Sequence, residues 1–301
     1  MKVGFVALVG RPNAGKSTLL NRLVGTKLAI VSDKPQTTRT RILGVRQDQS
    51  SQVIFVDTPG IHRPLHRMNV RMVDAAIDSM RQVDLVLLVV DVSEPPGRGD
   101  RYVLDLVAGV KAPVFLVLNK VDRVRKPSLL PIIERHAREG KFKEIVPISA
   151  ETGENVDRLD RAIVEALPEG EPLYPSDYLT DQPERVMAAE IVREKLLQFT
   201  HDELPFSSAV VVDRFEEPAE PKGMLKLYCT IMVDRESQKP IVIGRGGEMI
   251  KRIGTAAREE LERFFETRVY VDLRVSVKTD WRESDRLLHE LGYDGPGGGE
   301  R

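Results

Sequence analysis

The sequence predicts an α/β domain with a mostly parallel sheet, followed by a smaller α+β domain. In residues 1–167, apolar strand-like runs alternate with amphipathic segments of helical period. Residues 168–183 are Pro-rich and acidic without a sustained period, which predicts a linker. Residues 184–292 follow the order helix, strand, strand, helix, helix, strand, with a closing helix at 281–292. The Gly-rich end, residues 293–301, is predicted to be a disordered tail.

Six strand-like runs are expected in the first domain: VGFVALVG, RILGVRQ, QVIFVDTPG, VDLVLLVVDV, PVFLVLNKVD and EIVPISA. Helical stretches such as VRMVDAAIDSMRQ and LLPIIERHAREG lie between them. Parallel strands need a crossover connection, usually a helix, so helices are expected on both faces of this sheet.

The composition is typical of a globular chain: 41% hydrophobic and 30% charged residues among 301. The net charge of −1 excludes a global polycation, so nucleic-acid binding would need a local basic patch. The longest apolar runs are strand-sized and too short for a membrane span.

The apolar start of the chain is not interpreted as a signal peptide, because it leads directly into a glycine-rich loop that signal-peptide cleavage would destroy. The chain is therefore expected in the cytosol. The single cysteine, Cys229, is expected to be a small core residue.

The stretch GRPNAGKST fits the phosphate-binding pattern G-x-x-x-x-G-K-[ST] and lies between a predicted strand and a predicted helix. The glycines allow the backbone to approach a polyphosphate, and the helix N-terminus faces the same phosphates. Lys16 is expected near the β and γ phosphates, and the Ser17 hydroxyl on Mg²⁺. The predicted phosphate-binding residues are Gly10, Asn13, Ala14, Gly15, Lys16, Ser17 and Thr18.

Two further motifs favour guanine over adenine. In NKVD, Asp122 can accept hydrogen bonds from the guanine ring N–H and amino group, which adenine lacks. Asn119 would fix the loop, with Lys120 beside it. In SAETG, Ser149 and Ala150 follow another strand, and the Ala150 backbone N–H is expected to reach the guanine oxygen.

Two segments are expected to respond to the γ-phosphate. In DTPG, Asp57 suits a water-mediated Mg²⁺ contact, and the Gly60 N–H would face the γ-phosphate. The polar segment KPQTTRTR, residues 34–41, has no apolar period; we call it the switch I segment. Thr38 is the preferred second Mg²⁺ hydroxyl, with Thr37 as the alternative. Lys16, Thr38, Gly60 and Asn13 are therefore the candidate catalytic residues.

In the second domain, VIGRGGEMIKRIG places the glycine loop G-x-x-G between two helices. Within the order α-β-β-α-α-β, this predicts a type II KH domain, whose loop clamps a single-stranded nucleic-acid backbone. The predicted loop and basic residues are Gly244, Arg245, Gly246, Gly247, Lys251 and Arg252. Apolar residues expected to line the base groove are Ile241, Ile243, Met249, Ile250 and Ile253.

The motifs GRPNAGKS, PQTTR, DTPG, NKVD and SAETG together resemble the translation-factor-related GTPases. The PQTTR form and the KH domain make the chain similar to the Era family within that class. The resemblance implies Mg²⁺-dependent GTP hydrolysis, binding of the 3′ end of 16S ribosomal RNA, and a role in 30S subunit assembly and rRNA maturation. It also implies a peripheral contact with the inner membrane, and we expect a monomer.

One position departs from the better-known small GTPases. Ile61 follows DTPG where those proteins carry a water-orienting glutamine, so slow intrinsic hydrolysis is expected. The resemblance implies that Asn13 binds a K⁺ ion that replaces an arginine finger; Asn13 could instead simply cap the loop. His62 and His66 are interpreted as surface or loop-packing residues rather than catalytic ones.

The predicted function is a GTP-dependent switch that controls RNA binding, with the direction of coupling left open. One alternative is a GTP-bound scaffold or regulator of cell growth with very slow turnover, activated by an unidentified partner. Another is an enzyme that couples GTP hydrolysis to a second chemistry such as tRNA modification, but no additional nucleophile or cofactor motif is found. A third alternative is a metabolic ATPase or kinase, but the NKVD motif favours guanine over adenine and so argues against it.

Overall fold

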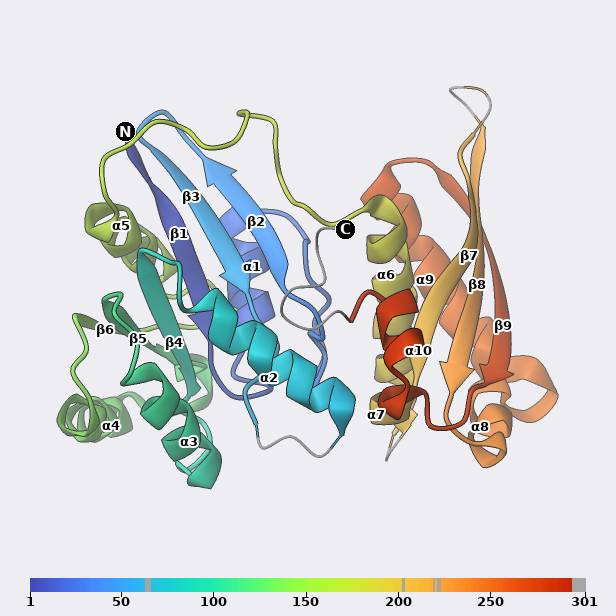
Figure 1. Ribbon diagram of the computed structural model, residues 1–301, viewed down its shortest axis with the longest axis horizontal. Helices are drawn as coiled ribbons and strands as arrows, with labels where there is room; N and C mark the ends of the chain where they lie inside the picture. Colours follow the sequence, from blue (N-terminus) through green and yellow to red (C-terminus); the bar gives the residue numbers. More distant parts are fainter. Residues whose placement is uncertain (63–65, 202–203, 219, 221–222, 294–301) are drawn as a thin grey trace. The chain divides into compact units, whose positions relative to one another are not determined.

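The computed structural model describes residues 1–62, 66–201, 204–218, 220 and 223–293. The chain divides into two compact units (Figure 1). The first contains residues 1–31, 35–181 and 293–301, and the second contains residues 32–34 and 182–292.

The first unit is built on a six-stranded sheet of order β2-β3-β1-β4-β5-β6 (Figure 1). Only β2 runs antiparallel to its neighbour, so the predicted mostly parallel sheet is confirmed. The strands are β1 (Lys2–Val9), β2 (Ile42–Gln47), β3 (Ser51–Asp57), β4 (Leu85–Asp91), β5 (Val114–Asn119) and β6 (Glu144–Pro147).

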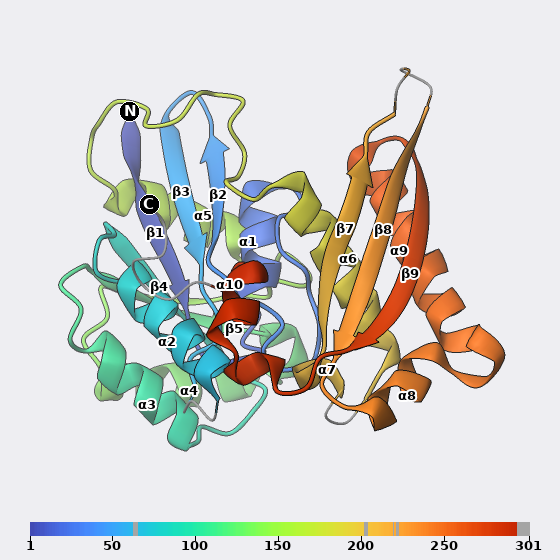
Figure 2. The ribbon, with the colours of Figure 1, turned by 45° about the vertical axis from the view of Figure 1, so that its right-hand side comes forward.

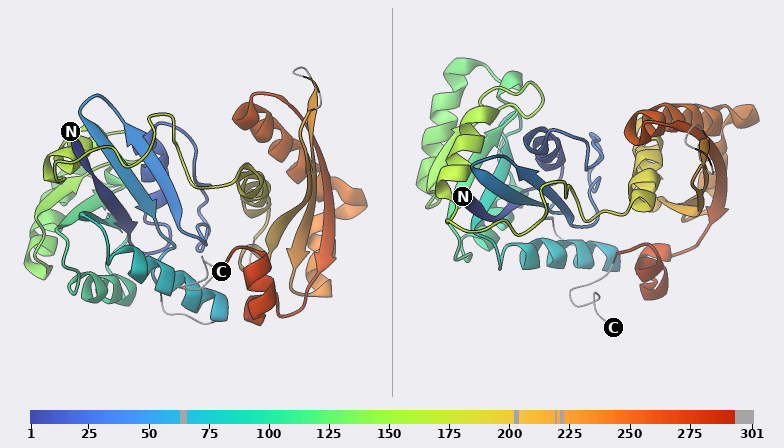
Figure 3. Two further views of the ribbon diagram at one scale, coloured as in Figure 1. Left: turned by 45° about the horizontal axis from the view of Figure 1, so that its top comes forward. Right: turned by 90° about the horizontal axis from the view of Figure 1, so that it is seen from above.

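Helices cover both faces of this sheet (Figure 3). Alternate side chains of β1 enter different cores, because successive residues of a strand point to opposite faces. Val6 and Leu8 pack with α1 and α5, whereas Ala7 and Val9 pack with α2, α3 and α4. The helices are α1 (Lys16–Val24), α2 (Arg67–Ser79), α3 (Arg98–Val107), α4 (Lys126–Glu139) and α5 (Val156–Ala166).

Most of the predicted linker lies along the first unit. The Gln52 side chain accepts hydrogen bonds from the backbone N–H groups of Leu173 and Tyr174, at 2.7 and 3.1 Å. The rings of Tyr174 and Tyr178 stack at 4.7 Å and pack against a cluster of β1, β2 and β3 side chains. Thr180 donates to the Leu43 carbonyl at 2.6 Å. The segment is therefore attached to the first unit up to residue 181, because its tyrosines cover apolar surface.

The second unit has a three-stranded sheet of order β7-β8-β9, in which β8 runs antiparallel to β7 and parallel to β9 (Figure 2). Its elements follow the predicted order of a type II KH domain. They are α6 (Glu184–Phe199), α7 (Leu204–Ser207), β7 (Ala209–Glu216), β8 (Met224–Val233), α8 (Lys239–Ile243), α9 (Glu248–Phe265), β9 (Arg268–Val277) and α10 (Asp285–Glu290). The closing helix is shorter than predicted, because a 3₁₀ turn at Trp281–Glu283 precedes it.

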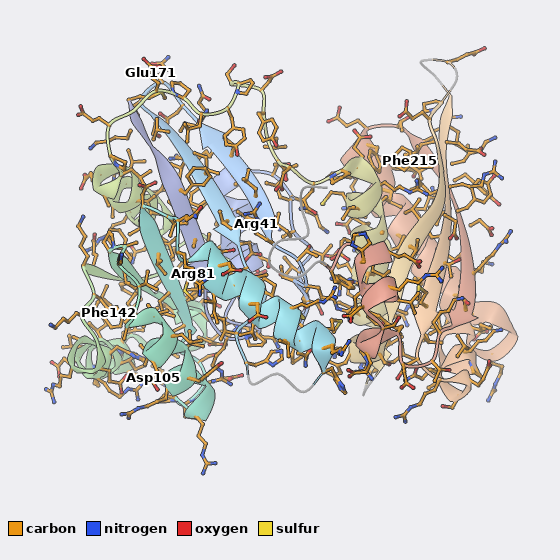
Figure 4. The ribbon with its side chains drawn as sticks, viewed as in Figure 1. Arg41, Arg81, Asp105, Phe142, Glu171 and Phe215 are labelled. Carbon is orange, nitrogen blue, oxygen red and sulfur yellow. The ribbon has the colours of Figure 1, made fainter. Side chains whose placement is uncertain are left out.

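The core of the second unit lies between this sheet and helices α6 and α9. Phe215 of β7, labelled in Figure 4, packs edge-to-face against Phe265 of α9 at a ring separation of 5.9 Å. Cys229 is buried in the same core, and this burial raises the pKa of its thiol to about 12. The interpretation of Cys229 as a core residue rather than a nucleophile is confirmed.

Candidate active site and nucleic-acid interface

The phosphate-binding loop joins the end of β1 to the start of α1. Gly15 has a φ of 91°, and a Cβ atom there would lie 2.2 Å from Asn119 Nδ2. Only glycine fits, because Asn119 must approach closely to donate a hydrogen bond to the Ala14 carbonyl at 2.8 Å. Asn119 therefore holds the phosphate loop as well as its own loop.

Lys16 is buried inside this loop. Its Nζ donates to the carbonyls of Gly10 and Arg11, at 3.3 and 3.0 Å. Burial lowers the pKa of Lys16 to about 8, and the charge of Asp57 opposes this shift. The ammonium is therefore still mostly charged at neutral pH, and an anionic phosphate beside it would stabilise that charge further.

The predicted magnesium residues converge. The Ser17 hydroxyl donates to Asp57 Oδ2 at 2.6 Å and lies 2.7 Å from Thr38 Oγ1. Burial raises the pKa of Asp57 to about 6, although Lys16 and the hydroxyl groups lower it. Asp57 Oδ1 is buried with no hydrogen-bond partner. Two hydroxyls and a carboxylate with an unsatisfied oxygen are hard ligands that fit Mg²⁺.

Gly60 packs directly against the phosphate loop. A Cβ atom at Gly60 would lie 2.6 Å from the backbone nitrogen of Pro12, so no larger residue fits without movement. The next residue, Ile61, is fully buried in the core, and its backbone N–H donates to the Gly10 carbonyl at 3.0 Å. The Ile61 side chain is apolar and buried, so it cannot orient a water molecule.

The predicted base-binding loops lie next to each other at the ends of β5 and β6. The Ala150 N–H donates to Asn119 Oδ1 at 2.9 Å, and its contact with the guanine oxygen stays a prediction. Ser149 is buried and accepts a hydrogen bond from the Thr152 N–H. The Asp122 carboxylate lies 4.0 Å from Arg123 Nε, too far for a hydrogen bond.

Asp91, which was not among the predicted site residues, lies at the end of β4 beside Asn119. Lys120 Nζ lies 2.5 Å from Asp91 Oδ2, and the Ser93 hydroxyl and N–H donate to Oδ1. These donors lower the pKa of the Asp91 carboxyl despite its partial burial. The pair fixes Lys120, whose φ of 66° is unusual for a residue with a side chain. The position of Asp91 at the carboxyl end of a predicted strand could have indicated that it lies at the site.

In the second unit, the G-x-x-G loop exposes Gly246 and leaves Gly247 partly exposed. Gly244 has a φ of 74°, and a Cβ there would lie 2.7 Å from the Met249 backbone nitrogen. Gly246 and Gly247 also have positive φ angles, but a Cβ atom at either would meet nothing within 4 Å. The loop thus presents open backbone at the N-terminus of α9, with the exposed Arg245 beside it.

The predicted groove residues do not all lie together. Ile253 is fully buried in the core rather than in a groove, because it lies one turn before buried Ala257 on the same face of α9. The Arg252 guanidinium lies over the Phe199 ring, 4.1 Å from its centroid, and lines a pocket of about 410 Å³ with Lys251. Ile243, Met249 and Ile250 are half-buried near the glycine loop.

Comparison with known proteins identifies a GTPase family in the first unit and a KH family in the second. Residues 5–120 match the family described as "50S ribosome-binding GTPase", and residues 203–282 match the KH domain family. GTPase Era of Geobacter metallireducens is 50% identical over 290 residues, covering 96% of this chain and 97% of that protein. GTPase Era of Heliobacterium modesticaldum is 45% identical, covering 98% of both chains.

Two solved structures share the fold. One is Era in complex with MgGDPNP and nucleotides 1506–1542 of 16S ribosomal RNA, with a TM-score of 0.93 and 44% identity. The other is a variant of Aquifex aeolicus Era bound to GDP·AlF4⁻, with a TM-score of 0.92 and 44% identity. Each comparison covers 97% of this chain and 99% of the other.

The fold and site define a P-loop GTPase joined to a C-terminal KH domain. Sequence identity of 45–50% over at least 96% of the chain is sufficient to assign the family. The chain belongs to the GTPase Era family, as the resemblance predicted.

Proposed function

We propose that this GTPase is a switch that binds the 3′ end of 16S ribosomal RNA through its KH domain and acts in 30S subunit assembly and rRNA maturation. GTP with Mg²⁺ would hold the segments that carry Thr38 and Gly60, and hydrolysis would release them. The observation that carries the proposal is that both segments contact the phosphate loop: Thr38 through Ser17, and Gly60 through Pro12.

The residues support hydrolysis mainly by electrostatic stabilisation. Lys16 would neutralise charge that develops between the β and γ phosphates, and the Gly60 N–H would donate to a γ-phosphate oxygen. Ser17, Thr38 and Asp57 would hold Mg²⁺, which would supply positive charge beside the phosphates. Because Ile61 is buried, no side chain at that position orients the attacking water, so unaided turnover should be slow.

A monovalent cation would complete this site. Arg11, the arginine within the phosphate loop, forms a salt bridge with Asp100 of α3 at 2.8 Å, so it does not serve as an arginine finger in this arrangement. Asn13 has a φ of 63° and lies two residues further along the loop. We propose that the Asn13 side-chain oxygen binds K⁺ next to the phosphates, where the ion would stabilise transition-state charge.

The RNA assignment rests on the G-x-x-G loop and on the RNA bound by the solved relative. Phosphates would approach the open backbone of Gly246 and Gly247, where Arg245 and the α9 N-terminus supply positive potential. A scaffold that keeps GTP bound is the alternative, and the buried Ile61 is the observation that favours it.

We also propose that the protein acts as a monomer in the cytoplasm, with a peripheral contact at the inner membrane. No helix among residues 1–62, 66–201, 204–218 and 223–293 is long and apolar enough to cross a bilayer. The membrane contact rests on the family resemblance alone, and co-sedimentation of the purified chain with anionic vesicles tests it.

GTP hydrolysis should be faster in K⁺ buffer than in Na⁺ buffer, by about tenfold, because the K⁺ ion proposed at Asn13 would stabilise the negative charge that develops in the transition state. An oligonucleotide matching the 3′ end of 16S rRNA should raise the rate further. Asn13→Gly is the matched variant, since glycine keeps the positive φ but removes the ligand; it should lose only the K⁺ effect. A slow rate that is equal in all conditions would favour the scaffold.

The pH dependence of kcat/KM should be bell-shaped, because it reports groups of the free enzyme. Below pH about 6 the Asp57 carboxyl is protonated, and above about 8 Lys16 loses its proton. Bound Mg²⁺ and triphosphate stabilise both charges, so the limbs of the kcat profile should lie further apart. Initial rates measured between pH 5 and 9 test this; a kcat/KM that stays constant above pH 8 would contradict the role given to Lys16.

A further inference from the structure

Tyr293 was predicted to begin a disordered tail, but the structure places it in the first unit with only 8% of its surface exposed. It follows α10 and Gly292, the last residue of the second unit. A buried tyrosine needs partners for its polar atoms. Both of the partners described here are arginines in segments that follow the nucleotide-binding motifs.

The first partner is Arg39, in the switch I segment. Arg39 Nη1 donates to the Tyr293 hydroxyl at 3.4 Å, and its guanidinium carbon lies 6.0 Å from the centre of the Tyr293 ring. Arg39 is 4% exposed. It directly follows Thr38, whose hydroxyl lies 2.7 Å from Ser17 Oγ. A contact that holds Arg39 therefore restricts the position of Thr38, one residue away.

The second partner is Arg71 of α2, the helix that follows DTPG. Arg71 Nη1 donates to the Tyr293 backbone carbonyl at 2.6 Å. The side chain of Tyr293 thus contacts the segment carrying Thr38, while its carbonyl is bound by the helix that follows Gly60. One residue links the two segments that the γ-phosphate is expected to order.

We propose that Tyr293 is a positioning residue that holds the switch I segment in the triphosphate-binding arrangement and so favours GTP over GDP. This rests on the proposed role of Thr38 as a ligand in the Mg²⁺–triphosphate complex. The diphosphate has no γ-phosphate for Thr38 and Gly60 to enclose, so GDP gains nothing from the contact. Tyr293 therefore raises affinity for the triphosphate selectively.

The test is the dissociation constant of the full-length chain for fluorescent GDPNP and for fluorescent GDP, both with Mg²⁺. Tyr293→Ala should weaken GDPNP binding by about tenfold and change GDP binding by less than about twofold. Arg71→Ala should act in the same direction. Tyr293→Phe keeps the ring and removes the hydroxyl that accepts from Arg39 at 3.4 Å, so its affinity for GDPNP should lie between those of Tyr293→Ala and the unchanged chain.

Tyr270→Ala, at an exposed tyrosine of β9, is the matched control and should leave both constants unchanged. Equal weakening of GDPNP and GDP by Tyr293→Ala, or no weakening of either, would overturn the proposal. Lys16→Ala distinguishes a failure of the Tyr293 proposal from a failure of the proposed nucleotide site. If the site is assigned correctly, Lys16→Ala loses both nucleotides; if it still binds both, the proposed function fails independently of Tyr293.

Discussion

Asp122→Asn should lower the affinity for GTP by about 10⁴-fold and create affinity for XTP. In the proposed guanine site, the carboxylate would accept hydrogen bonds from two guanine donors, the ring N–H and the amino group. Asparagine turns one acceptor into a donor, so it would face the guanine amino group with an N–H. Xanthine carries an oxygen at that position, and asparagine can donate to it. The Asp122→Asn variant should therefore bind xanthine in place of guanine.

The surroundings of Asp122 make this variant informative. Asp122 lies in the 3₁₀ turn Val121–Arg123, and the turn is fixed by buried Val121, whose N–H donates to the Ile148 carbonyl at 3.2 Å. The Asp122 carboxylate is partly exposed and lies 4.0 Å from Arg123 Nε. Removing its charge should therefore leave the fold intact, and the effect on binding should report base recognition.

Competition of GTP, XTP and ATP against a fluorescent GDP analogue measures the change. Asp122→Ala should lose GTP without gaining XTP, because alanine offers neither acceptor nor donor. Glu154→Gln removes an exposed carboxylate from a neighbouring loop and should bind GTP normally. If Asp122→Asn kept its preference for GTP, the guanine contact would have to come from another residue.

The sequence allowed prediction of those features that depend on short, contiguous motifs. The phosphate loop, DTPG and the G-x-x-G loop each need glycines at fixed positions, because a side chain would strike neighbouring atoms, as at Gly15, Gly60 and Gly244. The order of strands and helices followed from apolar periodicity. These features are local, so one sequence was sufficient to find them.

The features that were missed depend on contacts between distant residues. Nothing in the predicted linker indicated that Tyr174 and Tyr178 would cover a cluster on the first unit. Ile253 lies close to the glycine loop in sequence, but helix geometry turns it into the core. The Ala150 N–H donates to the Asn119 side chain, 31 residues away in the sequence, and no motif indicated this contact. Periodicity gives no signal for such pairs.

Gly246→Asp should weaken RNA binding by about a hundredfold while basal GTP hydrolysis stays unchanged. Gly246 has a φ of 58° and a ψ of 18°, a left-handed conformation that Asp and Asn tolerate better than other side chains. A Cβ atom there meets nothing within 4 Å, so no clash is expected. An acidic side chain near the N-terminus of α9 also interacts favourably with the helix dipole, so the fold should not suffer.

Gly246→Asn is the matched control because it has the same shape without the charge. If phosphates approach this loop, the Asp variant should bind an RNA matching the 3′ end of 16S rRNA at least about tenfold more weakly than the Asn variant. The difference should shrink as salt is raised, since screening weakens repulsion between a carboxylate and phosphates. Equal affinities for the two variants at low salt would show that the RNA backbone does not lie at Gly246. Lys251 and Arg252, which line a pocket of α9 together with Phe199, would then be the better candidates for the RNA contact.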